Sequence, residues 1–171
     1  MDMIFRPTTH HDAAALPAVE RAAGQRFQHI PALAWLADGP VISAARHDAF
    51  VEQGLSWSAL AGNHPVGFIL AEVHSSSLFI VELSVHLDWQ GNGIGRQLIA
   101  CAVEHARAMG LGSLTLTTFS DVPWNAPFYA RLGFVEVPEH ALTPALRQKR
   151  EEEAAQGFAY GSRCAMRLPL N

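Results

Sequence analysis

Gly91, Gly93 and Gly95 occupy alternate positions of one short segment, and a basic residue, Arg96, follows directly. Residues without a side chain let several backbone N–H groups converge on one anion, and a helix N-terminus adds a partial positive charge. Apolar residues recur at helical spacing after this segment, so it should open a helix. We therefore predict a phosphate-binding turn, although a turn that only needs unusual backbone angles would have the same glycines.

Two familiar phosphate-binding motifs do not fit this segment. The chain has no Gly-Lys-Ser or Gly-Lys-Thr, which excludes a P-loop. Alternate glycines also miss the dinucleotide-binding fingerprint, which begins with a parallel strand–helix–strand unit. Antiparallel strands are predicted before residue 90, so the turn should serve a different phosphate-containing ligand.

The strand before the turn offers groups for proton transfer. Alternation along residues 81–86 places Glu82, Ser84 and His86 on one face, opposite three apolar residues. A strand covered on both sides should be apolar on both faces, so this polar face indicates a cleft. Glu82 is the carboxylate best placed to take a proton from an ammonium group, directly or through water, and His86 is a second candidate. A solvated glutamate, or one paired with arginine, would give the same pattern.

The elements that must position these groups fit one mixed sheet. Strands at 55–61, 66–73 and 78–86 are joined by short turns and should form an antiparallel meander. A helix at 93–109 then connects the last of them to a strand at 114–119, a crossover that makes these two strands parallel. The remaining predicted elements are a strand at 4–6, a helix at 13–23, a short helix and loop at 27–39, a helix at 44–53, a helix at 125–132, a strand at 134–137, an exposed helix around 147–153 and a strand at 163–168.

These elements predict an α/β (α+β) fold with a mixed, mostly antiparallel central sheet of about seven strands and helices on both faces. The length of 171 residues suits a single domain, 1–171. With 49% hydrophobic and 16% charged residues the chain should be globular, and its formal charge of −4 argues against nucleic acid or membrane as a partner. No signal-peptide run or membrane-spanning stretch occurs, so a cytoplasmic location is expected. The nine histidines and two cysteines lack metal-ligand spacing, so no metal is expected.

Residues 83–86, Leu-Ser-Val-His, followed by Gln-Gly-Asn-Gly-Ile-Gly at 90–95, resemble the signature of the GNAT superfamily of acyl-CoA-dependent N-acetyltransferases. There the pattern Gln/Arg-x-x-Gly-x-Gly/Ala wraps the pyrophosphate of coenzyme A. Residues 125–134, Asn-Ala-Pro-Phe-Tyr-Ala-Arg-Leu-Gly-Phe, are similar to the family's later motif, with its tyrosine and closing Gly-Phe. The order of elements agrees from Ile4 to Val137, and the last strand can be matched as well.

The resemblance implies acetyl-CoA as co-substrate. In the family the signature strand and the next parallel strand splay apart, and the acetyl-pantetheine arm lies in the gap. The N–H of Val85 would stabilise the oxyanion, and Tyr129 would protonate the departing thiolate. The residues implied in coenzyme binding are Leu83, Ser84, Val85, Gln90, Gly91, Asn92, Gly93, Ile94, Gly95, Arg96, Asn125, Phe128 and Arg131.

The acceptor implied by the resemblance is a primary amine that attacks the thioester directly after Glu82 has helped to deprotonate it. Phe27 and Trp35 lie in the region that contacts acceptors in the family and are candidates for the substrate pocket. We expect a small-molecule amine such as an amino acid or polyamine. A protein N-terminus or lysine is the alternative acceptor, and a non-catalytic acyl-CoA sensor is the alternative class. Family members are often dimers, so the resemblance allows a homodimer.

Overall fold

The computed structural model describes residues 2–170, so the two end positions of the predicted domain, 1 and 171, lie outside the description. The strands are β1 (Met3–Pro7), β2 (Ser56–Ala61), β3 (His64–His74), β4 (Ser77–Val85), β5 (Ser113–Phe119), β6 (Val135–Glu136) and β7 (Arg163–Pro169). The α-helices are α1 (His10–Ala13), α2 (Leu16–Gly24), α3 (Ala44–Glu52), α4 (Ile94–Ala108), α5 (Ala126–Arg131) and α6 (Pro144–Ala155). The 3₁₀ helices are η1 (Gln25–His29), η2 (Pro31–Asp38), η3 (Leu87–Trp89), η4 (Glu139–Ala141) and η5 (Tyr160–Ser162).

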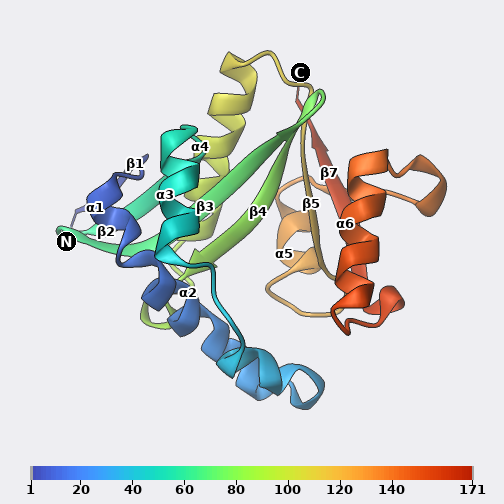
Figure 1. Ribbon diagram of the computed structural model, residues 1–171, viewed down its shortest axis with the longest axis horizontal. Helices are drawn as coiled ribbons and strands as arrows, with labels where there is room; N and C mark the ends of the chain where they lie inside the picture. The colour runs from blue at the N-terminus through green and yellow to red at the C-terminus, as the bar shows by residue number, and fades with distance from the viewer. Residues whose placement is uncertain (1, 171) are drawn as a thin grey trace. The chain divides into compact units, whose positions relative to one another are not determined.

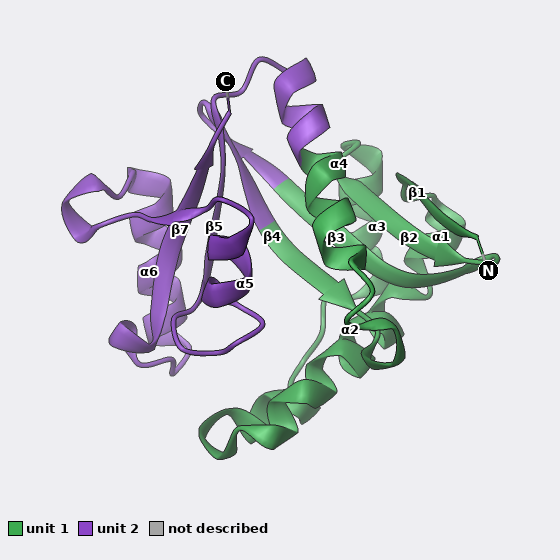
Figure 2. Cartoon of the chain, turned by 180° about the vertical axis from the view of Figure 1, so that it is seen from behind, with its two compact units in different colours: residues 1–71, 81–102 green, residues 72–80, 103–171 purple. Residues whose placement is uncertain are grey.

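Within residues 2–170, seven strands form one mixed sheet in the order β1-β2-β3-β4-β5-β7-β6 (Figure 1). β1 pairs with β2, β2 with β3, β5 with β7 and β6 with β7, all antiparallel, whereas β4 and β5 are parallel at Ser77–Phe79 and Ser113–Thr115. The predicted mixed, mostly antiparallel sheet and the parallel pairing of β4 with β5 are therefore confirmed. The chain divides into two compact units, residues 1–71 with 81–102 and residues 72–80 with 103–171 (Figure 2).

In the first unit, helices cover both faces of the sheet. Neighbouring residues of a strand point to opposite faces, and in β3 these residues are Gly67 and Phe68. A Cβ at Gly67 would lie 3.3 Å from the side chains of Ile94 and Leu98, so α4 packs on this face at a place where only glycine fits without displacement. On the other face the Phe68 ring meets His47 of α3 edge-on, with ring centroids 4.9 Å apart.

His47 should make the fold sensitive to acid. It is fully buried, and within residues 2–170 neither ring nitrogen has a hydrogen-bond partner. Burial, assisted by Arg46, lowers the pKa of His47 to about 4. An unfolded histidine has a pKa of about 6.5, so between these two pKa values the unfolded chain binds more protons and stability falls as the pH falls.

We expect His47→Leu to remove about 3 kcal/mol of the stability loss between pH 7 and 4, because leucine has no proton to bind. Urea unfolding at a series of pH values measures this loss. His64→Leu, a change of an exposed histidine in β3, should keep the acid sensitivity of the parent. Equal acid sensitivity in His47→Leu and the parent would contradict the assignment.

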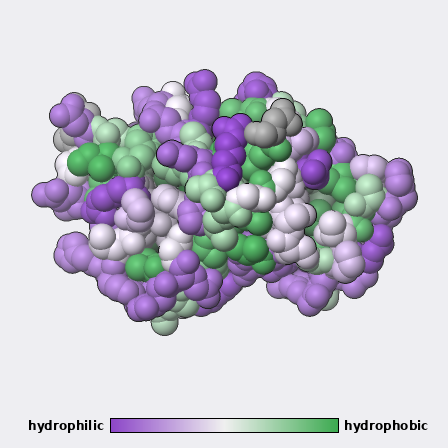
Figure 3. Space-filling model, turned by 90° about the horizontal axis from the view of Figure 1, so that it is seen from above, coloured by the Kyte–Doolittle hydropathy of each residue, from purple (hydrophilic) through white to green (hydrophobic). Residues whose placement is uncertain are grey.

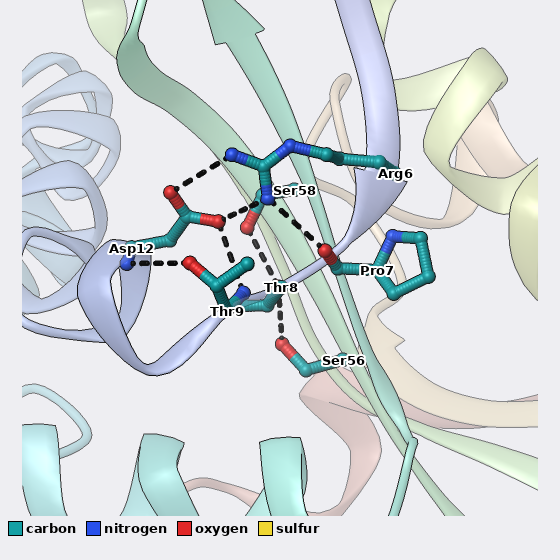
Figure 4. Close-up of polar contacts among 7 residues, drawn as sticks. All are labelled: Arg6, Pro7, Thr8, Thr9, Asp12, Ser56 and Ser58. Carbon is teal, nitrogen blue, oxygen red and sulfur yellow. Dashed lines mark hydrogen bonds and ion pairs between the residues drawn. The ribbon is translucent and has the colours of Figure 1, made fainter.

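A polar network fixes the start of α1 against β1 (Figure 4). Arg6 Nη1 donates to Asp12 Oδ2 at 2.6 Å. Asp12 Oδ2 also accepts from the Thr9 N–H at 3.0 Å, while Thr9 Oγ1 accepts from the Asp12 N–H at 3.1 Å, which completes a capping box. Beside it, Thr8 Oγ1 is hydrogen-bonded to the buried hydroxyls of Ser58 at 2.6 Å and Ser56 at 2.7 Å, which ties β1 to β2.

Asp12→Asn is expected to lower the free energy of unfolding at pH 7 by about 2 kcal/mol, because Arg6 loses its buried anionic partner. Burial alone would raise the pKa of Asp12, but the hydrogen bonds from Arg6 and Thr9 hold it below its usual value. The stabilisation is therefore full above the unfolded pKa of about 4 and is lost as the pH falls through the folded pKa. Denaturant unfolding should show that the free energies of unfolding of the parent and of Asp12→Asn become equal in acid. Asp48→Asn, at a half-exposed carboxylate paired with His10, is the control and should cost less than about 1 kcal/mol.

In the second unit, helices again cover both faces of the strands. The Thr117 hydroxyl of β5 donates to Glu153 of α6, and Arg163 Nε of β7 donates to the same carboxylate at 2.8 Å. On the opposite face a Cβ at Gly133, just after α5, would lie 3.3 Å from the Leu168 side chain of β7. The prediction of helices on both faces is thus confirmed in each unit.

Three predicted helical segments differ from the structure. The helix predicted over 13–23 is two helices, α1 and α2, because the capping box starts the first and Pro17, which is tolerated only in a first turn, starts the second. The helix and loop predicted at 27–39 are the 3₁₀ helices η1 and η2. The helix around 147–153 is not simply exposed, because Arg150 is only 6% exposed and donates to the Tyr160 carbonyl at 2.8 Å.

Large apolar side chains are exposed at several separate places. They are Ile4, Trp35, Val73, Leu87, Met109, Val135 and Tyr160. In Figure 3, hydrophobic residues on the face shown occur in several areas with hydrophilic residues between them. No helix of residues 2–170 combines the length and the apolar character that crossing a membrane requires.

Candidate active site

The glycine segment forms a tight turn at the start of α4, in the first unit. Gly91 and Gly93 have φ values of 84° and 77°, in the left-handed region that favours glycine. A Cβ at Gly91 would meet no atom within 4 Å, and one at Gly93 would meet only the Arg96 guanidinium at 4.0 Å. Backbone conformation, not crowding, therefore requires glycine at these two positions.

The first turn of α4 presents its backbone donors at this segment. The Gly93 carbonyl accepts from the Gln97 N–H at 3.2 Å, so Gly93 directly precedes the helix. N–H groups of a first helical turn have no acceptor within the helix, and the helix dipole makes that end positive. Arg96 is exposed beside them, whereas Ile94 is buried and anchors the turn to the core. The arrangement can bind a phosphate group.

Two polar side chains of the turn are used within the protein. Asn92 Nδ2 donates to the Trp89 carbonyl at 3.0 Å, which closes the turn. Gln90 Nε2 donates to the Val85 carbonyl at 2.7 Å, and the Gln90 Oε1 atom is buried with no hydrogen-bond partner among residues 2–170. The motif suggests contact with the coenzyme for both residues, but it does not reveal these bonds to the backbone.

The backbone at the end of β4 is held firmly. The Val85 carbonyl accepts the bond from Gln90, and the N–H of the same peptide group, on His86, donates to the Val66 carbonyl at 2.8 Å. Both polar atoms of this peptide group are therefore fixed. The Val85 N–H, the predicted oxyanion donor, belongs to the preceding peptide group with the Ser84 carbonyl, so these two bonds fix its neighbour, and the oxyanion role of Val85 stays a prediction.

The polar face predicted on β4 is present. Ser84 Oγ donates to Glu82 Oε2 at 3.1 Å, so the two side chains lie on one face of the strand. Ser84 is 5% exposed, and Glu82 is half-buried. His86 lies beyond the strand, and its Nδ1 accepts from the Asp88 N–H at 3.1 Å, which caps η3. His86 thus has a local structural use, and Glu82 is the better candidate for a base.

In the second unit, residues 125–134 pack around Tyr129. The Tyr129 ring is 8% exposed and makes edge contacts with Phe128 and Phe134 at centroid distances of 5.2 and 5.5 Å. Asn125 occupies the N-cap position of α5, and its carbonyl accepts from the Tyr129 N–H at 3.1 Å. Arg131 is exposed at the end of the helix. The motif therefore builds a rigid setting for one phenol group.

Phe27 and Trp35 lie on η1 and η2, which extend from α2 away from the strands of the first unit (Figure 1). Gln25 Nε2 donates to the Ala37 carbonyl at 3.0 Å and holds the two 3₁₀ helices together. Trp35 is 53% exposed and Phe27 is half-buried. Their contact with an acceptor stays a prediction.

The predicted site residues fall into two groups. The first unit holds Phe27, Trp35, Glu82, Leu83, Ser84, Val85, Gln90, Gly91, Asn92, Gly93, Ile94, Gly95 and Arg96, and the second unit holds Asn125, Phe128, Tyr129 and Arg131. Within the described residues, no group of three or more His, Cys, Asp or Glu side chains could hold a metal ion.

Comparison with known proteins identifies the family. The model of the acetyltransferase (GNAT) family matches residues 20–134, a range that includes both the glycine turn and the Tyr129 motif. This match covers well over half of the chain. The chain belongs to the acetyltransferase (GNAT) family.

A curated relative is similar in sequence, and two solved structures are similar in fold. The chain is 27% identical over 88 residues to the uncharacterized N-acetyltransferase YvbK of Bacillus subtilis, a match that spans 51% of this chain and 57% of that protein. The fold resembles the PaiA N-acetyltransferase of Thermoplasma acidophilum in complex with coenzyme A, with a TM-score of 0.66, 14% identity and coverage of 99% and 100% of the two chains. It also resembles the ribosomal-protein-S18-alanine N-acetyltransferase of Escherichia coli, with a TM-score of 0.69, 18% identity and coverage of 99% and 95%.

Proposed function

We propose that this protein transfers the acetyl group of acetyl-CoA to a primary amine of a small molecule. The observation that carries the proposal is the turn at 90–96, whose two left-handed glycines bring backbone donors to the N-terminus of α4. Family membership supports acetyl-CoA as the ligand of this turn. We further propose that both compact units serve one catalytic domain, 1–171, and the family resemblance allows a homodimer.

The proposed reaction is a direct transfer. Glu82 accepts a proton from the substrate ammonium, directly or through water, and the freed amine attacks the thioester carbonyl. The Val85 N–H stabilises the negative charge on the carbonyl oxygen. As the carbon–sulfur bond breaks, the attacking nitrogen loses its second proton to solvent, and Tyr129 gives its proton to the departing thiolate and regains one from solvent. The amine ends as an acetamide and the coenzyme as a free thiol.

An acyl-enzyme intermediate on cysteine is not needed and is not favoured. Within residues 2–170, neither Cys101 nor Cys164 is part of a disulfide. Burial raises the pKa of Cys164, which keeps this thiol protonated and weakly nucleophilic. Cys101 lies in the middle of α4, beyond the first turn that faces the glycine segment.

The path of residues 139–161 supports a small acceptor over a peptide. A peptide needs an open groove, but in the second unit this segment covers one face of the strands with α6. Lys149 Nζ lies 5.2 Å from the centre of the Phe79 ring on β4 and 3.4 Å from Glu72 Oε1 on β3. Because α6 contacts β3, β4, β5 and β7 in this unit, a peptide acceptor cannot lie across this part of that face.

A panel of acceptors tests the proposed substrate class. Amino acids, polyamines and other small amines, together with peptides that carry a free N-terminus or lysine, are incubated with acetyl-CoA while thiol release is followed. We expect small amines to give the highest kcat/KM. Turnover of peptides alone would replace the small-amine proposal with protein acetylation. Binding of acetyl-CoA without thiol release from any acceptor would favour the sensor.

A further inference from the structure

We propose that Ser84 is a positioning residue that orients the Glu82 carboxylate for proton transfer through its side-chain hydroxyl. This role rests on the proposed function of Glu82 as the base. It is separate from the backbone contact with the coenzyme that the family resemblance implies for Ser84.

The geometry fixes the direction of the bond. Ser84 Oγ lies 3.1 Å from Glu82 Oε2, and because an ionised carboxylate can only accept, the hydroxyl must donate. The two residues are two positions apart on β4, so their side chains emerge from the same face. With Ser84 only 5% exposed, water has little access to take the place of the hydroxyl.

The backbone that holds the hydroxyl is itself confined. A Cβ at Gly67 would lie 3.2 Å from the Ser84 carbonyl oxygen, so the backbone of β3 approaches β4 closely at this point. The hydroxyl is therefore presented by a packed strand and not by a mobile loop. A short, stiff side chain on such a strand is suited to positioning a longer, more flexible one.

The bond restricts how the base can be oriented. A glutamate side chain has three rotatable bonds, and a donor at one oxygen restricts the plane in which the second oxygen lies. Loss of the hydroxyl should therefore reduce turnover and leave coenzyme binding intact.

The test compares Ser84→Thr with Ser84→Val, two variants of the same shape that differ in the hydroxyl. We expect Ser84→Val to have a kcat about tenfold below that of Ser84→Thr, the effect of one hydrogen bond to a charged group, with equal dissociation constants for acetyl-CoA. Ser77→Ala is the matched control, because it removes a hydroxyl from the same strand that is bonded to Ser113 at 2.7 Å. It should keep the kcat of the parent.

A double-mutant cycle separates positioning from a general effect on the strand. In a Glu82→Gln background, Ser84→Val should lower kcat by much less than tenfold, because the base that the hydroxyl orients is already gone. Equal kcat in the Thr and Val variants, or the same tenfold loss in both backgrounds, would overturn the positioning role. Full activity of Glu82→Gln alone would instead refute the proposed base, so the two failures are distinguishable.

Discussion

Glu82→Gln is expected to lower kcat at neutral pH about a hundredfold or more, the usual contribution of a general base. Glutamine keeps the size of the side chain and can still accept the bond from Ser84, but it cannot take a proton. The loss of kcat should shrink as the pH approaches the pKa of the substrate amine, about 10, because the amine is then already deprotonated and needs no base. The measurement is kcat against pH for the parent and the variant with the best acceptor.

The control for this change is Glu104→Gln, at an exposed glutamate of α4, which should keep the activity of the parent. Acetyl-CoA should bind both variants with the affinity of the parent, which shows that the coenzyme site is intact. A kcat at neutral pH within about twofold of the parent would remove Glu82 from the mechanism.

Tyr129→Phe is expected to lower kcat about a hundredfold, because the departing thiolate loses its proton donor. The fold should be retained, since phenylalanine keeps the ring contacts with Phe128 and Phe134. A thioester whose thiol is more acidic releases a more stable thiolate, which needs less protonation as it leaves. The loss of kcat caused by Tyr129→Phe should therefore be smaller with such an acetyl donor, and kcat for a series of thioesters measures this dependence.

Tyr160→Phe is the matched control for the phenol. The Tyr160 hydroxyl donates to Glu139 at 2.6 Å, and the residue is 42% exposed, so its loss should leave kcat unchanged. If Tyr129→Phe turns over like the parent, or if its deficit is the same with every thioester, Tyr129 is not the acid.

The sequence predicted the parts of the site that depend on local patterns. Glycines at alternate positions before an apolar helical repeat indicated the turn, because a left-handed backbone such as that of Gly91 and Gly93 selects one residue type. Period-two alternation indicated the shared face of Glu82 and Ser84, which their hydrogen bond confirms. These features need no knowledge of distant segments.

Features that depend on contacts between distant segments were not predictable in this way. The packing of α6 on the sheet arises from pairs such as Lys149 with Phe79, seventy positions apart, and the charged run 147–153 read alone looks like a solvated helix. The break between α1 and α2 had local signals in Thr9 and Pro17, but the alanine-rich run outweighed them because alanine is a strong helix former. The bond from Gln90 to the Val85 carbonyl likewise requires the folded turn.

The most direct test of the proposed transfer follows the acetyl group itself. The protein is incubated with acetyl-CoA labelled in the acetyl carbon and with its best small amine, and label is measured by mass spectrometry in the amine and in the protein while free thiol is counted. Direct transfer predicts one labelled acetamide for each thiol released and no label on Cys101 or Cys164. Thiol release without labelled amine, or label on either cysteine, would contradict it.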